Sequence, residues 1–143
     1  MDGFLMDESM FRQVIMDHYN YPQNKVVEEL DGYIKLEGIN PSCGDQLTIF
    51  MQVENGKIKD IKFLGSGCSI CCASASVMTQ EINEMIIEEA IIKIDAFKNM
   101  VTNKEGAEQF EDAQAFLGVY KFPARFKCAF LSWDTARKIL EEV

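Results

Sequence analysis

The chain has 143 residues, of which 48% are hydrophobic, and its formal net charge is −9 at pH 7. This length predicts one domain, residues 1–143, with a substantial core, and it leaves no room for a second domain of ordinary size. The negative charge, together with the absence of any Lys/Arg run longer than two residues, argues against nucleic-acid binding.

The sequence contains no stretch that approaches the roughly 18 apolar residues of a membrane span. Its first ten residues also lack the basic and apolar regions of a secretion signal. We therefore expect a cytoplasmic protein without a membrane partner. The five cysteines of the chain are then better interpreted as thiols or metal ligands than as disulfides, because the cytosol is reducing.

An amphipathic helix is predicted near the amino terminus. Asp7 or Ser9 can cap it, and it should end before Pro22. The residues that recur at helical spacing on its apolar face are Phe11, Val14, Ile15 and His18. His18 is the only histidine, and a hydrogen-bonded core histidine is a commoner role on such a face than a metal ligand or a catalytic base.

Three strand patterns follow, in residues 34–36, 47–53 and 61–63, where apolar residues alternate with polar ones or form a short apolar run. Asn55-Gly56 lies between the last two. This dipeptide favours a type I′ hairpin turn, because both central positions of that turn need a positive φ. The sequence therefore predicts an antiparallel meander.

After Gly67 the apolar residues recur with a helical period. A first helix should bury Ala75, Met78, Ile82 and Met85, a second Ala90, Ile94, Phe97 and Val101, and a final one Ala129, Trp133, Ala136 and Leu140. Pro123 can start the final helix. Residues 101–114 are largely polar and are expected to run over the surface, with at most a short helix.

Strands therefore come first and helices later, in separate blocks. This order predicts an α+β fold, in which a small three-stranded antiparallel sheet carries the helices on one face, together with the amino-terminal amphipathic helix.

Three cysteines lie at the ends of predicted elements. Cys43 falls in a turn-forming segment, Cys68 at a strand-to-helix junction, and Cys128 near the start of the last helix, after Arg125 and Lys127. Helix starts and neighbouring positive charges favour an ionised sulfur. The spacing of the three cysteines matches no zinc finger, and each of them can equally be a small core residue.

Asp45 can be a ligand beside Cys43, although a turn-forming role is favoured from the pattern alone. Cys71 and Cys72 lie in the small-residue run "CCASAS", and core packing is the favoured interpretation of both. Cys68-x-x-Cys71 resembles a redox or metal half-site, but the rest of a thioredoxin-like context is absent.

Four motifs occur in order: "HYNYPQN", "NPSCGD", "GSGCSICCASAS" and "FPARFKCA". Together they resemble the U-type iron-sulfur cluster assembly family (IscU/NifU N-terminal-like), over residues 10–140. Lys127 stands where IscU-type scaffolds carry a histidine, and the segment around residues 88–110 is longer than theirs. Both features resemble the SufU branch, although SufU proteins generally have no cysteine at positions 71 and 72.

The resemblance implies a zinc site with three sulfur ligands and one oxygen ligand, a set suited to tetrahedral zinc. The implied ligands are Cys43, Asp45, Cys68 and Cys128, with a transient iron-sulfur cluster as the alternative cofactor. Arg125 and Lys127 would steady anionic sulfur near the site, or would simply be solvated helix charges.

The implied function is sulfur relay. A PLP-dependent, SufS-like cysteine desulfurase would pass persulfide sulfur to this chain, which would deliver it to a downstream acceptor or cluster scaffold. Cys43 is the expected sulfur acceptor, because a loop residue can move without breaking a helix, and Cys128 is the alternative. The rival hypotheses are an iron-sulfur scaffold, a non-catalytic zinc-stabilised interaction module, and a dithiol oxidoreductase that uses Cys68 and Cys71.

Overall fold

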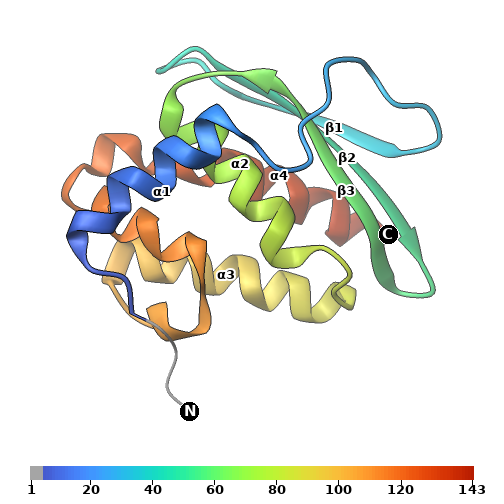
Figure 1. The fold of residues 1–143 in the computed structure, drawn as a ribbon. Coiled ribbons are helices and arrows are strands. Elements are labelled where there is room, and N and C mark those ends of the chain that lie inside the picture. Colours follow the sequence, from blue (N-terminus) through green and yellow to red (C-terminus); the bar gives the residue numbers. More distant parts are fainter. Residues whose placement is uncertain (1–4) are drawn as a thin grey trace.

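The computed structural model describes residues 5–143, and these form a small sheet with the helices on one side of it (Figure 1). The predicted α+β fold is thus confirmed. In chain order the elements are α1 (Glu8–Asn20), β1 (Ile34–Asn40), β2 (Asp45–Glu54), β3 (Lys57–Ser66), α2 (Ser69–Ile82), α3 (Ile87–Asn103), the 3-10 helices η1 (Ala107–Gln109), η2 (Asp112–Lys121) and η3 (Pro123–Arg125), and α4 (Phe126–Glu142).

The three strands form an antiparallel meander in the order β1-β2-β3, as the sequence predicts. The β2–β3 hairpin closes at the pair Glu54 and Lys57. Between them Asn55 has a φ of 55° and Gly56 a φ of 73°, which are the positive values that a type I′ turn requires.

The core lies between the sheet and the helices. Leu47, Ile49 and Met51 alternate along β2 and are fully buried in the same cluster as the apolar residues of α2, α3 and α4. Phe50 points to the other face of the sheet, where the ring of Tyr33 meets it edge-on at a centroid distance of 6.3 Å. Burial of Leu47, Ile49 and Met51 against the helices is the main force that holds the helical layer on the sheet.

Helix α1 begins and ends where the sequence indicates. Asp7 is its N-cap and accepts a hydrogen bond from the backbone amide of Ser9, and the helix ends at Asn20, before Pro22. The apolar face is half-buried and His18 is buried. His18 Nδ1 lies 2.7 Å from Ser76 Oγ, and its Nε2 lies 2.7 Å from Asp112 Oδ2. The expected hydrogen-bonded core histidine is confirmed.

Two expectations were wrong. Met85 does not continue the face of α2, because the helix ends at Ile82 and Glu84 adopts a positive φ of 66°. Met85 instead accepts a hydrogen bond from the amide of Ile58 at the start of β3. The chain therefore leaves the helix to pair with the sheet.

The second correction concerns residues 101–114, which were expected to run over the surface. Val101 still belongs to α3, and Phe110, Ala113 and Gln114 are buried. A few apolar residues in this polar stretch anchor η1 and η2 against the core, where Phe110 meets Phe97 edge-on.

Across the described residues, no helix combines the length and the apolar character that a membrane crossing needs.

Candidate metal centre

Three parts of the fold supply the side chains of the site. Cys43 lies in the turn of residues 41–44, between β1 and β2, and Asp45 is the first residue of β2. Cys68 is the N-cap of α2, and Cys128 lies in the first turn of α4. The turn is tight: the amide of Cys43 donates to the carbonyl of Asn40 at 3.3 Å. The long-range packing of the fold thus brings residues together that are far apart in the sequence.

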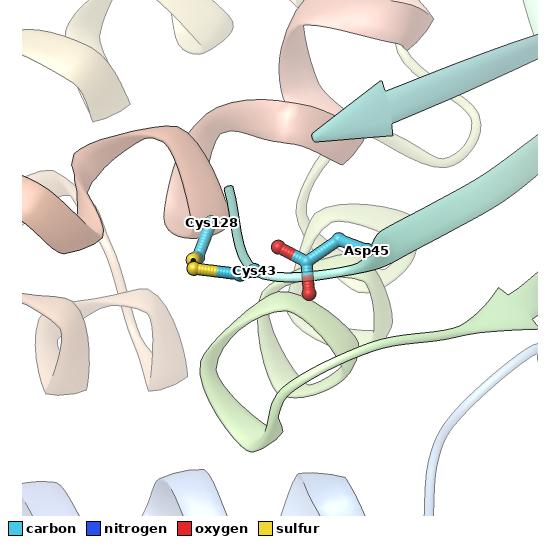
Figure 2. A group of neighbouring side chains, drawn as sticks. All are labelled: Cys43, Asp45 and Cys128. Carbon is cyan, nitrogen blue, oxygen red and sulfur yellow. Dashed lines mark hydrogen bonds between the residues drawn. The ribbon is translucent and has the colours of Figure 1, made fainter. Parts of the chain in front are cut away.

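Cys43, Asp45 and Cys128 form a compact group of donor atoms. One ligand atom from each, two sulfurs and a carboxylate oxygen, lies within 4.8 Å of the other two. Figure 2 shows the two sulfur atoms facing each other across the gap between the turn and α4, with the carboxylate beside them. The two sulfurs are 3.0 Å apart, and both cysteines are free thiols.

Cys68 borders this group without belonging to it. Its sulfur caps α2 by accepting a hydrogen bond from the amide of Cys71 at 3.4 Å, and its own amide donates to Asp45 Oδ1 at 2.9 Å. Its side chain also contacts Cys128, as one of the hydrogen-bond partners that raise the pKa of that thiol. Of the four residues that the family resemblance implies as ligands, three therefore form the compact group and Cys68 lies at its border.

The environment of Cys128 differs from the one that the sequence suggests. Arg125 and Lys127 were expected to favour an ionised sulfur, but burial raises the pKa of the Cys128 thiol, and hydrogen bonds with Cys43, Cys68 and Asp45 raise it further. Removal from water disfavours the charged form more than the nearby cations favour it. A bound cation would reverse this order, because a coordinating thiol is deprotonated outright.

The two basic residues take different positions. A terminal nitrogen of the Arg125 guanidinium lies 3.8 Å from Cys43 Sγ. A hydrogen bond with Cys128 and the attraction of Cys43, Cys68 and Cys128 in their ionised form raise the pKa of Arg125. Lys127 is exposed, and no hydrogen bond or ion pair between described residues joins it to the cluster. Of the two expected supporting residues, only Arg125 therefore contacts the sulfurs.

Cys71 and Cys72 are core residues, with exposed fractions of 0% and 4%. Burial raises the pKa of both thiols, and the negative charge of Asp45 raises that of Cys71 further. The favoured interpretation of these two cysteines is confirmed. A nucleophilic role of Cys71, as in the dithiol hypothesis, is not supported, because the thiolate and not the thiol is the reactive form.

Two residues of the site were not singled out from the sequence. Asn40 is buried, and its side-chain amide contacts both Asp45 and Cys128. Gly67 lies so close to Asp45 that a Cβ atom there would be 2.5 Å from Asp45 Oδ1. The only signal in the sequence is their place beside a cysteine motif, since turn-forming Asn and Gly residues are common in any loop.

The donor set fits a zinc ion. Thiolate sulfur and carboxylate oxygen are both zinc ligands. The three donor atoms lie within 4.8 Å of one another, and such a group could hold one metal ion.

Comparison with known proteins identifies the family. Residues 10–129 match the profile of the NifU-like N-terminal domain. The chain is 44% identical to the zinc-dependent sulfurtransferase SufU of Bacillus subtilis, an alignment that covers 92% of this chain and 89% of that protein. It is 35% identical to the iron-sulfur cluster assembly scaffold protein IscU of Streptococcus pyogenes, over 92% of this chain and 83% of that one.

A solved structure supports the same assignment. The SufU protein of Fervidobacterium islandicum, a candidate iron-sulfur cluster assembly scaffold for the SUF system, superposes with a TM-score of 0.75 at 30% identity. The superposition covers 96% of this chain and 98% of that one. The chain therefore belongs to the family of NifU-like N-terminal domains, in agreement with the resemblance of its four motifs.

Proposed function

We propose that the chain is a zinc-dependent sulfurtransferase, which accepts persulfide sulfur from a PLP-dependent cysteine desulfurase for iron-sulfur cluster assembly. The observation that carries this proposal is the group formed by Cys43, Asp45 and Cys128. It occurs in a chain that is 44% identical, over nearly its whole length, to a zinc-dependent sulfurtransferase. A downstream acceptor or cluster scaffold would then receive the sulfur.

The zinc ligands in this proposal are Cys43, Asp45, Cys68 and Cys128. Bound zinc would supply the positive charge that keeps these sulfurs deprotonated at neutral pH. Cys128 is buried in α4 and Cys68 caps α2, so both are held by helices. Asp45 is held by the amide of Cys68.

Cys43 is the residue best placed to accept sulfur. It is half-buried, whereas Cys128 is fully buried, and it lies in a short turn instead of a helix. Its thiolate would attack the outer sulfur of the desulfurase persulfide. A new S–S bond forms on Cys43, the S–S bond of the desulfurase breaks, and the desulfurase cysteine leaves as a thiolate, so that no oxidant is needed. Arg125, next to Cys43 Sγ, would stabilise the anionic persulfide.

The proposal is tested with Cys43→Ala in a desulfurase assay. This variant should keep its fold, yet lose stimulation of the desulfurase and show no mass gain of one sulfur atom. Cys72→Ala is the matched control, because Cys72 is buried outside the cluster, and it should behave as the wild type. If Cys43→Ala still accepts sulfur, the acceptor is Cys128 or another residue and the assignment of Cys43 is wrong.

An iron-sulfur scaffold is the second candidate, because the chain also aligns over 92% of its length with a scaffold protein, IscU of S. pyogenes. The same four residues would then hold a cluster. Anaerobic reconstitution with iron and sulfide separates the two candidates. A stoichiometric visible chromophore that survives desalting would favour the scaffold, whereas a colourless protein that retains its zinc would favour the sulfurtransferase.

A further inference from the structure

Asn40 lies at the centre of the contacts that hold the cluster together. It is the last residue of β1 and pairs directly with Asp45, the first residue of β2, across the turn that carries Cys43. Its exposed fraction is 4%. A side-chain amide this deeply buried needs hydrogen-bond partners, because an unpaired polar group away from water costs free energy.

The partners of its side-chain nitrogen are two of the three donor residues. Asn40 Nδ2 lies 3.0 Å from Asp45 Oδ2 and 3.5 Å from Cys128 Sγ. An amide nitrogen carries two hydrogens and a carboxylate can only accept. This orientation is therefore the one that the network demands, since the reverse would press the amide oxygen against a carboxylate oxygen.

The main chain of Asn40 reaches the third donor residue. Its carbonyl oxygen accepts the hydrogen bond from the amide of Cys43 at 3.3 Å. The Asn40 side chain thus contacts Asp45 and Cys128, whereas Asn40 contacts Cys43 only from backbone to backbone. Arg125, on the exposed surface, is the described donor at Cys43 Sγ besides the Cys128 thiol.

We propose that Asn40 is a positioning residue of the metal centre, which fixes Asp45 and Cys128 as the permanent ligands and leaves the sulfur of Cys43 free to exchange. This inference rests on the zinc site of the proposed function. Hydrogen bonds to ionised acceptors are stronger than those between neutral groups, so the amide stabilises the two ligands once they are charged. A neutral amide does so at any pH, and it adds no positive charge that would repel the metal.

The inference is tested on the metal-binding protein itself, without a desulfurase. Zinc affinity is measured by chelator competition for the wild type, Asn40→Ala and Asn40→Ser. Loss of an outer partner of a metal ligand typically lowers metal affinity about 10- to 100-fold, and we expect this loss for Asn40→Ala. Asn40→Ser keeps one short donor and should lie between the other two. Asn99→Ala, which removes an exposed amide from α3, is the matched control and should bind zinc as the wild type does.

Cobalt substitution supplies a second measurement, the absorption spectrum of the bound metal, which would not change if Asn40 only supported the fold. A hydrogen bond lowers the energy of the sulfur lone pairs, so its loss in Asn40→Ala should move the sulfur-to-cobalt charge-transfer absorption to longer wavelength. Asn40→Ser should partly restore the band position. Circular dichroism of the metal-free proteins verifies the fold. If Asn40→Ala does not fold, Asn40→Ser is compared with the wild type instead.

The outcomes separate this inference from the proposed function. If Asn40→Ala binds zinc as tightly as the wild type and its cobalt band does not move, Asn40 has no role in the centre, and the proposed function is untouched. If the variant loses affinity and the band moves, while wild-type protein holds zinc but never accepts sulfur, the role of Asn40 stands and the proposed function is wrong.

Discussion

Gly67 gives Asp45 room to reach the start of α2. An alanine Cβ at this position would lie 2.5 Å from Asp45 Oδ1 and 3.2 Å from the Cα atom of Asp45, and the backbone there cannot yield as a flexible side chain would. Gly67→Ala should therefore displace the carboxylate and break its hydrogen bond with the Cys68 amide. We expect a loss of zinc affinity of about tenfold or more, measured by chelator competition.

Gly118→Ala is the control for this experiment. It adds the same methyl group to η2, where the nearest atom belongs to the side chain of Phe11 at 3.2 Å, away from the cluster. Its zinc affinity should equal that of the wild type. Equal affinity of Gly67→Ala would instead mean that Asp45 needs no fixed position to serve the centre.

Cys71 separates the sulfurtransferase from the dithiol oxidoreductase. Its side chain is fully buried, and its contact with Cys68 uses the backbone amide, which alanine also has. Cys71→Ala should keep full sulfur acceptance and lower the free energy of unfolding by about 1 kcal/mol through lost packing. Mass spectrometry of persulfide formation and urea unfolding measure the two effects. Loss of activity with an unchanged zinc content would revive the dithiol hypothesis.

At the scale of single residues, the sequence identifies the cysteines but not their surroundings. Cys43, Cys68 and Cys128 belong to recognisable motifs, so the family resemblance points to them. Asn40 acts through a contact with Cys128, 88 positions along the chain, and no local pattern encodes such a contact. The high pKa of Cys128 was missed for the same reason, because it depends on burial by the whole fold.

Among the elements, α1 packs on α2 and η2 through a half-buried apolar face, and its one buried side chain, His18, also bonds to both. His18 bridges Ser76 of α2 and Asp112 of η2. His18→Ala would remove both hydrogen bonds and leave the Ser76 hydroxyl, which is fully buried, with fewer partners. We expect the free energy of unfolding to fall by about 2–3 kcal/mol, since each buried hydrogen bond contributes about 1 kcal/mol and stranded polar groups add to the cost.

Gln13→Ala tests whether this loss is specific to the bridge. Gln13 lies on the exposed side of the same helix and bonds only to Asp17 within α1 among the described contacts. Its replacement should change stability by less than about 0.5 kcal/mol. Urea unfolding followed by circular dichroism measures both variants. Equal losses for the two would mean that the helical propensity of α1, and not the bridge, determines the stability.

The elements themselves were predictable to different degrees. Periodicity and the Asn55-Gly56 turn predict the meander and the long helices, because one face of each is buried over many residues. The short helix expected within residues 101–114 is η1. The longer η2 was not predicted, since it buries Ala113, Gln114 and Phe116 without a regular period. The end of α2 also depends on a tertiary pairing, between Met85 and Ile58, that helical spacing does not reveal.

In the whole molecule, the candidate metal centre lies against a large apolar core, and Cys128 belongs to both. Buried apolar residues of the sheet and of α2, α3 and α4 form one continuous cluster. Within it the rings of Phe97 and Trp133 are stacked with centroids 3.9 Å apart. Trp133 is the only tryptophan of the chain, and its exposed fraction is zero, so its fluorescence reports on global unfolding.

Zinc removal should therefore loosen the protein without unfolding it. The cluster joins the β1–β2 turn to α2 and α4, and a ligand that binds only the folded state stabilises it by about 2.7 kcal/mol at a hundredfold excess over its Kd. In a chain of this length 1 kcal/mol corresponds to about 2–4 °C. Chelation should then lower the Tm by roughly 5–10 °C, as read from Trp133 fluorescence, while the far-ultraviolet circular dichroism at 25 °C stays unchanged.

The same measurement tests the hypothesis of a zinc-stabilised interaction module. In such a module the metal is the main source of folding free energy, so chelation would abolish the circular dichroism signal outright. A sulfurtransferase instead needs a fold that survives while Cys43 leaves its place to react. The sulfurtransferase proposal therefore predicts that the folded core is retained after chelation and that the Tm recovers fully when zinc is returned.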